Sequence, residues 1–460
     1  MVEAISQLIR EIPASPARVL LSGFAGFILL GTLLLELPIS AAPGHSLGLV
    51  DAFFTATSAV CVTGLVVKDI HNDFSLLGQI VILLLIQIGG LGYMTVATII
   101  TLFLGRHIGL KERLALREAL NLTSLEGLVR FTLRVVRITL LIEAIGALLL
   151  TIRFAFDFHL AKALYWGVFH AVTAFNNAGF SLFSTNLMSY RSDIVVNLVI
   201  TTLIVLGGIG FIVYSNIMSL HRGEIHRLWL HSKLTLATTA GLIFGGTFLF
   251  FLFEFQRAQT LGQLPIPERL LASYFQAISA RTAGFNTVDL SQLSSAALYL
   301  LMVLMFIGAS PGGTGGGIKT TTFATIALDL WTTLRGQVEA TLYRRRLPAA
   351  IVAKAYLIAA FAFVWLTVAT LVLLGVEHLE ADKYFLKMLF EVTSALGTVG
   401  LSTGDGGVLS FSALFSDFGK LLIALTMLAG RIGPLTLGSA VLKSQEKSRI
   451  RYPEGEILVG

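Results

Sequence analysis

Long apolar stretches that are nearly free of charged residues recur along the chain and alternate with polar connections. A helix needs roughly 20 apolar residues to cross the hydrocarbon layer of a membrane. Only Arg18, Glu143 and Arg431 interrupt the stretches, which predict eight spanning helices. They cover residues 17–35, 74–105, 138–152, 194–221, 234–253, 290–318, 355–376 and 421–442.

A shorter and less apolar run lies between the two spans of each successive pair. These runs cover residues 50–63, 164–177, 270–282 and 385–398. They are too short to span a membrane but have the length of re-entrant segments. The repeating unit is therefore a span (M1), a re-entrant pore helix with its loop, and a second span (M2).

The pattern predicts an all-α integral membrane protein in which four pseudo-symmetric M1–pore loop–M2 units surround one central pore. Only 13% of the residues are charged, whereas soluble domains carry about 25%, which excludes an ordinary soluble enzyme. The predicted boundaries are unit 1 at 1–104, a cytoplasmic linker at 105–123, unit 2 at 124–220, a linker at 221–231, unit 3 at 232–335, a basic linker at 336–349, unit 4 at 350–443 and a tail at 444–460.

Basic residues such as Arg344, Arg345 and Arg346 concentrate in the connections between units. The positive-inside rule then predicts that both termini and all linkers are cytoplasmic. The formal net charge of +6 is spread over these loops and does not indicate nucleic-acid binding. With Cys61 as the one cysteine, no internal disulfide and no zinc cluster is expected.

Each re-entrant run ends in a glycine that is followed by Leu or Phe. The four glycines lie 115, 105 and 116 positions apart, and an aromatic residue stands ten positions before each. Self-similarity at a nearly constant spacing indicates a repeated unit. The candidate selectivity filter comprises each glycine and the two residues before it: Val62, Thr63 and Gly64; Asn177, Ala178 and Gly179; Thr282, Ala283 and Gly284; Thr398, Val399 and Gly400.

The chemistry of such a segment favours a cation. Non-helical backbone at membrane depth is tolerated only where it is buried or lines a water-filled path. A helix that enters from outside directs its partly negative C-terminal end toward the membrane centre, and glycine lets the chain turn back with its carbonyl groups facing an axis. Four copies predict a ring of oxygens that replaces the hydration shell of a cation, as the filter loops of potassium channels do. The alternative, glycines that only allow close helix packing, fits one such position better than four.

Glycines recur in the second spans as well, at residues 89–92, 207–210 and 430–433, where we expect helix contacts. The matching part of unit 3, residues 308–319, is expanded and cannot form a continuous helix. Its place beneath the filter indicates an intramembrane gate that breaks the third M2 helix. The candidate gate residues are Gly308, Ser310, Pro311, Gly312, Gly313, Thr314, Gly315, Gly316, Gly317, Lys319 and Arg431.

Residues 312–320 also come close to a nucleotide-binding P-loop. The lysine, however, follows the last glycine by two positions instead of one, and an apolar span replaces the buried strand.

Two intramembrane arginines need partners or a water-filled path. Arg431 is expected to raise a barrier to cations below the filter, or to pair with Glu143 or Asp329. Arg281 is expected to brace the third filter loop through an acid or through backbone carbonyls.

With these motifs the sequence resembles the superfamily of potassium transporters that includes Trk, Ktr and plant HKT proteins, and within it the KtrB-type ion-conducting subunit. The motifs that carry the resemblance span the chain. They are residues 61–65, 176–180, 281–285, 397–401 and 308–322.

The resemblance implies potassium uptake across the bacterial cytoplasmic membrane, often sodium-dependent, with ions held only at the filter residues. It implies a homodimer in membrane lipid and a cytosolic KtrA-type regulatory ring that binds ATP or ADP, while this chain holds no cofactor. A sodium-selective or co-transporting member of the same architecture is the nearer alternative, although Gly64 favours potassium. The remote alternative is an intramembrane enzyme, but no catalytic residues can be assigned.

Overall fold

The computed structural model of the chain describes residues 16–44, 47–103, 116, 127–337, 339–377, 381–404 and 409–433. The predicted tail at 444–460 lies outside these ranges, as does the linker at 105–123 apart from Leu116. The last predicted span is described only as far as residue 433.

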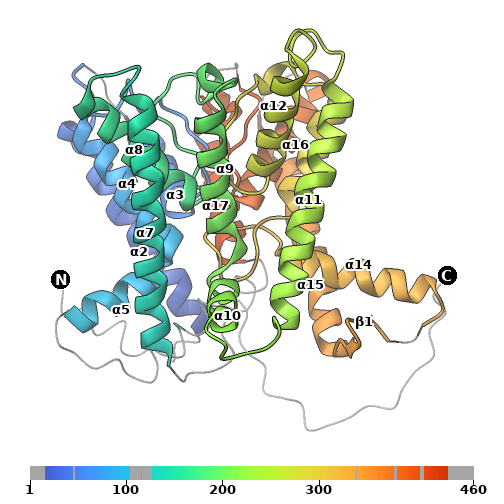
Figure 1. Cartoon of the computed structure of the whole chain (residues 1–460). Coiled ribbons are helices and arrows are strands. Elements are labelled where there is room, and N and C mark those ends of the chain that lie inside the picture. Colours follow the sequence, from blue (N-terminus) through green and yellow to red (C-terminus); the bar gives the residue numbers. More distant parts are fainter. Residues whose placement is uncertain are drawn as a thin grey trace, which may run out of the picture.

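The regular structure of the described residues is almost entirely helical, and a long helix is followed by a shorter one and then by further helices in each quarter of the chain (Figure 1). The helices of the first two quarters are α2 (Pro16–Glu36), α3 (Leu49–Val60), α4 (Leu76–Leu91), α5 (Tyr93–Phe103), α7 (Leu128–Phe154), α8 (Leu160–Phe175), α9 (Ile194–Ile209) and α10 (Phe211–His221). Those of the last two are α11 (Leu230–Glu254), α12 (Ile266–Ser279), α13 (Ser295–Phe306), α14 (Thr320–Leu334), α15 (Ala349–Val376), α16 (Ala381–Gly397) and α17 (Asp417–Ile432).

Short elements complete the described part. The 3-10 turns are η1 (Pro38–Ser40), η2 (Met188–Tyr190), η3 (Leu290–Gln292) and η4 (Phe411–Leu414). One antiparallel pair of strands, β1 (Thr341–Leu342) and β2 (Arg345–Arg346), closes a hairpin between α14 and α15.

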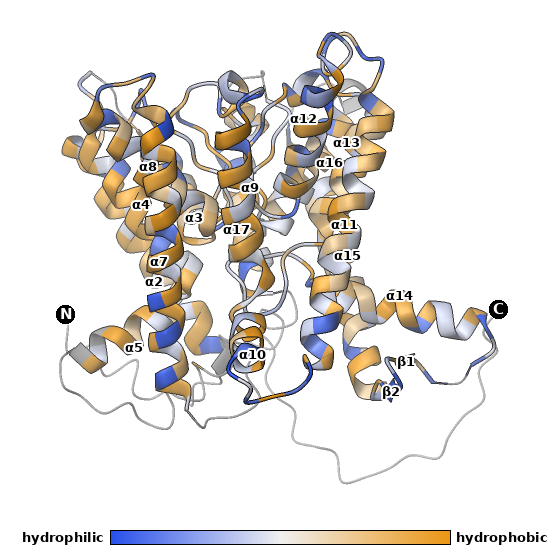
Figure 2. Cartoon of the chain, in the orientation of Figure 1, coloured by the Kyte–Doolittle hydropathy of each residue, from blue (hydrophilic) through white to orange (hydrophobic). Residues whose placement is uncertain are grey.

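Four helices of the described part are long and apolar enough to cross a membrane: residues 18–36 of α2, together with α7, α11 and α15. At most a third of the residues in each apolar stretch are buried, and Figure 2 shows hydrophobic residues along most of these helices and hydrophilic ones at the lower ends. The other spans expected from the sequence are shorter or divided in the structure, so the count of eight stays a prediction.

Two spans that the sequence shows as uninterrupted are broken at a glycine. Gly92 (φ 77°) separates α4 from α5, and Gly210 (φ 98°) separates α9 from α10, which bend by 92°. We expected only helix contacts at these glycine clusters. The last glycine of each cluster adopts a left-handed backbone that ends a helix at no steric cost.

The first glycines of the same clusters do make the expected close contacts. A Cβ atom built on Gly89 would lie 2.1 Å from the carbonyl oxygen of Val60, and one on Gly207 would lie 1.8 Å from that of Phe175. Both carbonyls belong to the last residue of a short helix, α3 or α8. Glycine is therefore required where a second helix crosses the end of a pore helix.

The helix that follows the short helix and its loop in each quarter, namely α4, α9, α13 or α17, begins with the same kind of cap. A side-chain oxygen accepts a hydrogen bond from the backbone N–H three residues later, which satisfies one free donor of the first turn. The capping residues are Ser75, Asp193, Ser294 and Ser416. The equal caps start these helices at corresponding points of the repeat.

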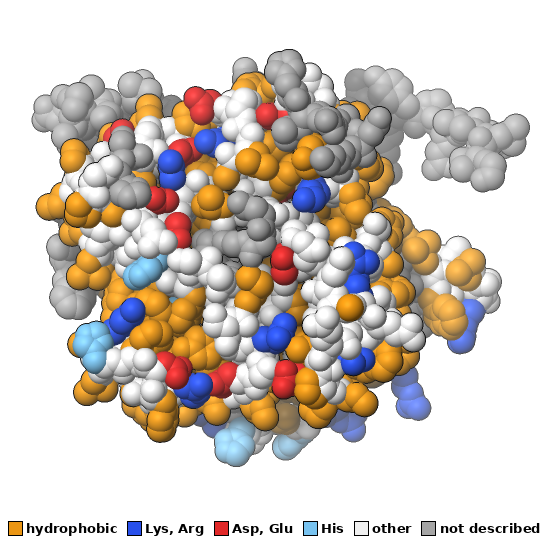
Figure 3. Space-filling model, turned by 90° about the horizontal axis from the view of Figure 1, so that it is seen from above, with side chains coloured by type: hydrophobic (Ala, Val, Ile, Leu, Met, Phe, Trp, Pro, Cys, Tyr) orange, Lys and Arg blue, Asp and Glu red, His pale blue; other side chains and the backbone are white. Residues whose placement is uncertain are grey.

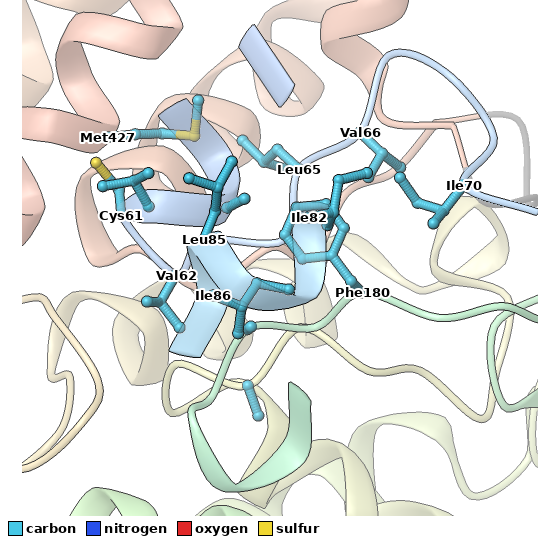
Figure 4. Packing of buried hydrophobic residues seen from close by; sticks show 14 of the residues in the cluster. Cys61, Val62, Leu65, Val66, Ile70, Ile82, Leu85, Ile86, Phe180 and Met427 are labelled. Atoms are coloured by element: carbon cyan, nitrogen blue, oxygen red, sulfur yellow. The ribbon is translucent and has the colours of Figure 1, made fainter. Parts of the chain in front are cut away.

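The ends of the short helices lie in the hydrophobic core. The aromatic residues ten positions before the filter glycines are fully buried at Phe54, Phe169 and Phe390, and in unit 3 the neighbour Phe275 takes this place. Figure 4 shows the end of α3 at Cys61 packed near Leu85 and Met427. This packing fixes the position at which each short helix ends and its loop begins.

Candidate ion-conduction site

The four filter glycines, far apart in sequence, meet in one ring. A Cβ atom on each glycine would clash with the carbonyl oxygen of the residue that precedes the next unit's glycine. The four pairs are Gly64 with Ala178 (2.4 Å), Gly179 with Ala283 (2.8 Å), Gly284 with Val399 (2.4 Å) and Gly400 with Thr63 (2.2 Å). The contacts close a circle in the order of units 1, 2, 3 and 4, with main-chain oxygens at every step.

Left-handed backbone occurs twice in each loop. The glycines have φ values of 93°, 69°, 76° and 90°, and the residues two positions earlier are left-handed as well. The earlier residues are Val62 (φ 56°), Asn177 (57°), Thr282 (83°) and Thr398 (48°). Such a conformation costs a non-glycine residue about 1–3 kcal/mol and persists only where the surroundings enforce it. Sequence reasoning had assigned unusual backbone to the glycines alone.

The strain is held by the hydrogen bonds that end the short helices. In unit 1 the N–H of Val62 donates to Ala59 O (3.1 Å), and the N–H of Thr63 donates to Ser58 O (2.8 Å). These two bonds make a Schellman motif, which usually has glycine at the left-handed position. Units 2 and 4 repeat both bonds with 3.1 and 2.8 Å, and 3.1 and 2.9 Å. Unit 3 differs, because Ala283 N bonds to Ser279 O one residue closer.

Hydroxyl groups behind the ring were not found by sequence reasoning. Ser58 Oγ accepts from Gly64 N (3.1 Å), Ser394 Oγ accepts from Gly400 N (3.1 Å), and Ser279 Oγ donates to Phe285 O. The recurrence of serine five or six positions before three of the glycines was the available signal. These bonds turn the backbone of the ring residues in a fixed direction.

A small hollow lies on the outer side of the ring and is lined by the four glycines. Its wall is completed by residues that follow the glycines, including Ser181, Asn286 and Ser402. Asp and Glu side chains are spread over this face of the molecule (Figure 3). The arrangement allows a small ion to approach the ring from this side.

The stretch from Ile307 to Lys319 contains all the candidate gate residues except Arg431 and lies on the opposite side of the ring. α13 ends before it at Phe306 and α14 begins after it at Thr320. Its ends are held together, since Gly308 N donates to Ile318 O (2.8 Å). Its middle is bound to the glycine cluster of unit 2, since Ser310 N donates to Gly208 O (2.9 Å).

Three consecutive residues of this stretch touch the left-handed filter residues of three units. Asn177 Nδ2 donates to Thr314 Oγ1 (3.0 Å), and Gly316 N donates to Thr398 Oγ1 (3.1 Å). A Cβ atom on Gly315 would lie 2.2 Å from Thr282 Oγ1. The glycines are needed because side chains would not fit under the filter.

Arg431 fastens the same stretch from the side of unit 4. Its guanidinium donates from Nη1 to Thr314 O and from Nη2 to Gly89 O. One side chain therefore connects the second helices of units 1 and 4 with the loop of unit 3. Lys319 supports the loop from within, since its Nζ donates to Gly315 O (2.8 Å).

The expected pairing of Arg431 with Glu143 or Asp329 is wrong. Glu143 accepts hydrogen bonds from Gln87 (3.2 Å) and Asn176 (2.9 Å), and Asp329 accepts one from the Tyr356 hydroxyl (2.9 Å). These uncharged partners occupy both carboxylates, and the guanidinium uses backbone carbonyls instead.

Arg281 is buried with 8% of its surface exposed, and its Nε has no hydrogen-bond partner in the described part of the chain. The brace that we expected from this side chain to an acid or a carbonyl is therefore not formed by that nitrogen.

Comparison with known proteins identifies the class to which this site belongs. Residues 28–450 match the family TrkH, described as a cation transport protein. The chain belongs to this family, whose members are membrane ion transporters and not enzymes.

Individual relatives are similar over nearly the full length. The chain is 41% identical to the Ktr system potassium uptake protein B of Bacillus subtilis, with 99% of both chains covered. It is 36% identical to the potassium/sodium uptake protein NtpJ of Enterococcus hirae, with 97% of both covered. The fold is similar to that of the potassium transporter TrkH from Vibrio parahaemolyticus, with a TM-score of 0.69, 20% identity and coverage of 94% and 86%.

Proposed function

We propose that the chain is the ion-conducting subunit of a bacterial potassium uptake system. The observation that carries the proposal is the ring of four glycine loops, in which each loop brings a main-chain oxygen beside the next unit's glycine. Rings of backbone carbonyls can replace the hydration shell of a monovalent cation. The names of the relatives, a potassium uptake protein and a potassium/sodium uptake protein, support potassium as the ion.

In this proposal four M1–pore loop–M2 units, at 1–104, 124–220, 232–335 and 350–443, form one pore. The filter is made by the twelve residues at 62–64, 177–179, 282–284 and 398–400. Their convergence from four loops supports the assignment. Ions then move passively down their electrochemical gradient, and no catalytic residue is needed.

The stretch at 308–319 acts as the gate in a broken third M2 helix. Its contacts with Asn177, Thr282 and Thr398 support this role, because they close the inner side of the filter. Arg431 has two effects in the proposal. Its charge opposes cations below the filter, and its hydrogen bonds to Thr314 and Gly89 keep the loop in place.

Both termini and the linkers are cytoplasmic in this proposal. Basic residues at the lower ends of the long helices support it, among them Arg130 and Arg134 of α7 and Arg345 and Arg346 of β2. The filter hollow then opens to the outside, and the gate faces the cytoplasm.

The subunit forms a homodimer through the face around α14. This helix extends sideways from the bundle (Figure 1) and exposes Leu330 (51%), Trp331 (55%) and Leu334 (83%). A groove of about 1560 Å³ with an almost wholly apolar lining lies between α13, α14 and α15. A second copy could cover both surfaces within the membrane lipid.

A cytosolic KtrA-type ring, which binds ATP or ADP, regulates the pore from the side of the basic linkers. The relatives named as proteins of a Ktr system support a partner of this kind. Sodium dependence, or a sodium-conducting variant of the same function, is the second candidate, and the potassium/sodium uptake protein among the relatives favours it.

The experiment is growth of an uptake-deficient bacterium at limiting potassium, with and without a regulatory partner, followed by potassium and sodium fluxes in proteoliposomes. Gly64→Ser should reduce the preference for potassium over sodium, because its Cβ would lie 2.4 Å from Ala178 O. Gly241→Ser is the matched control, since nothing lies within 4 Å of a Cβ there. An unchanged ion preference in folded Gly64→Ser would overturn the filter assignment.

A further inference from the structure

Two of the four pore helices carry a buried ionisable side chain nine positions before the filter glycine. These residues are His170 in α8 and Glu391 in α16, and neither has any exposed surface. The corresponding residues of units 1 and 3 are Thr55 and Phe275. Since the ring order is 1, 2, 3, 4, the two polar helices stand on opposite sides of the ring.

Each of these side chains holds the serine two positions after its own glycine. In unit 2, His170 Nδ1 lies 2.8 Å from Trp166 O, so this nitrogen carries the proton, and Nε2 accepts from Ser181 Oγ (3.1 Å). Ser181 Oγ in turn accepts from Phe183 N (3.0 Å). This series of hydrogen bonds therefore fixes the backbone that follows Gly179 just outside the ring.

Unit 4 repeats the arrangement with a carboxyl group. Ser402 Oγ donates to Glu391 Oε2 (2.6 Å), and Ser402 Oγ accepts from Phe411 N (2.7 Å). The other oxygen, Oε1, accepts from Ser412 N (2.9 Å) and from the Ser412 hydroxyl. One buried carboxyl group thus joins the segment just after the filter, at Ser402, to the later part of the same loop, at Ser412.

The loops of units 2 and 4 then reach across to the next unit. Leu187 N donates to Asn286 O (3.1 Å), which ties unit 2 to unit 3. Ser410 N donates to Val66 O (2.8 Å), and Val66 N donates to Ser410 Oγ (2.9 Å), which ties unit 4 to unit 1. Both Asn286 and Val66 stand two positions after a filter glycine. These hydrogen bonds join units 2 and 3 and units 4 and 1 at the positions just after the filter glycines, beside the serines that His170 and Glu391 bind.

We propose that Glu391 and His170 are positioning residues that set ion selectivity by fixing the outer turn of the filter. This inference rests on the proposed function of the ring. Neither side chain lines the outer hollow of the filter, so each acts through the serine that it holds. Selectivity depends on the number and placement of carbonyl oxygens, and buried groups that lose a hydrogen-bond partner shift to find another. Removal of the side chain of Glu391 or of His170 is therefore expected to move the filter carbonyl oxygens of two units.

The test measures potassium and sodium fluxes of purified variants in proteoliposomes. Glu391→Ala should lower the potassium-to-sodium flux ratio about tenfold, an order typical of couplings through a hydrogen-bond network. Glu391→Gln keeps an acceptor for Ser412 N and should fall between this variant and wild type. Glu377→Gln is the matched control, because Glu377 is buried in the same unit but, among the described residues, its carboxylate accepts hydrogen bonds from Ser416 at the start of α17.

For unit 2, Ser181→Ala and His170→Ala should change the ratio equally, and the double variant no further. A wild-type flux ratio in folded Glu391→Ala and His170→Ala would overturn the inference, and so would an equal loss in Glu377→Gln. If Gly64→Ser changes the flux ratio while these variants do not, the filter assignment is supported and the positioning role of Glu391 and His170 is rejected. If wild type itself shows no potassium flux, the proposed function fails. Should Glu391→Ala not fold, Ser402→Ala decides in its place.

Discussion

Replacement of Arg431 tests how strongly one side chain holds the gate. In the structure its guanidinium donates two hydrogen bonds to backbone carbonyls, those of Thr314 and Gly89. A hydrogen bond from a charged group contributes about 1.5–3 kcal/mol. Glutamine can form at most one of the two, so Arg431→Gln should weaken the hold on the loop by about that amount. Since 1.4 kcal/mol corresponds to a factor of ten, the ratio of open to closed pores should rise about ten- to hundredfold.

The assay is potassium flux into proteoliposomes at fixed protein density, without a regulatory partner. Arg431→Lys separates the two effects of the arginine. Lysine keeps the positive charge but lacks the planar guanidinium group whose two terminal nitrogens donate to both carbonyls. If charge repulsion dominates, this variant stays as closed as wild type, and if the hydrogen bonds dominate, it leaks like Arg431→Gln.

Lys420→Gln serves as the control on the same helix, because Lys420 pairs with Asp51 at the outer end of α17. It should leave the flux unchanged. Wild-type flux in a folded Arg431→Gln protein would refute both effects. Failure of Arg431→Gln to fold would show that the two bonds are structural.

Three further outcomes are expected. Deletion of residues 312–317 should raise potassium flux, because it removes the contacts beneath the filter, and a folded variant with wild-type flux would argue against a gate. Gly207→Ala should lower the free energy of unfolding by about 3 kcal/mol, since its Cβ would lie 1.8 Å from a backbone carbonyl oxygen. Gly208→Ala should be tolerated, because its Cβ would lie 3.5 Å from its nearest neighbour. Equal melting temperatures of the two variants would contradict this prediction. Glu254→Gln should lower the melting temperature but not the flux, because Glu254 binds Thr260 and the cap residue Ser294 far from the ring; a changed flux would show that this cap reaches the pore.

The sequence predicted the helical class and the short helices because both depend on local periodicity. The run at 50–63 anticipates α3 at Leu49–Val60, and the run at 164–177 anticipates α8 at Leu160–Phe175. The interruption at Gly210 could not be predicted, because glycine is also common inside membrane helices. At Gly210 the carbonyl oxygen of Pro311 lies 2.4 Å from a built Cβ, a contact between distant residues that no local pattern shows.

Contacts between distant residues were the main limit on predicting the site. The repeat showed that Gly64 and Gly179 are equivalent, but it did not show that their loops touch. The pairing of Arg431 was misjudged because its charge was matched with an opposite charge, that of Glu143 or Asp329. In the fold, the guanidinium donates instead to the backbone carbonyls of Thr314 and Gly89. The left-handed backbone of Val62 gives no signal at all, since valine rarely adopts it.

The expanded stretch between α13 and α14 has a consequence for how such a pore can evolve and move. In an assembly of four identical chains, every insertion is present four times, and a gate must be built from four equal pieces. Here the repeats share one polypeptide, so a single quarter can diverge while the other three keep their glycine contacts. If this stretch is the gate, as proposed, opening requires the displacement of one segment, without any concerted rearrangement around the axis.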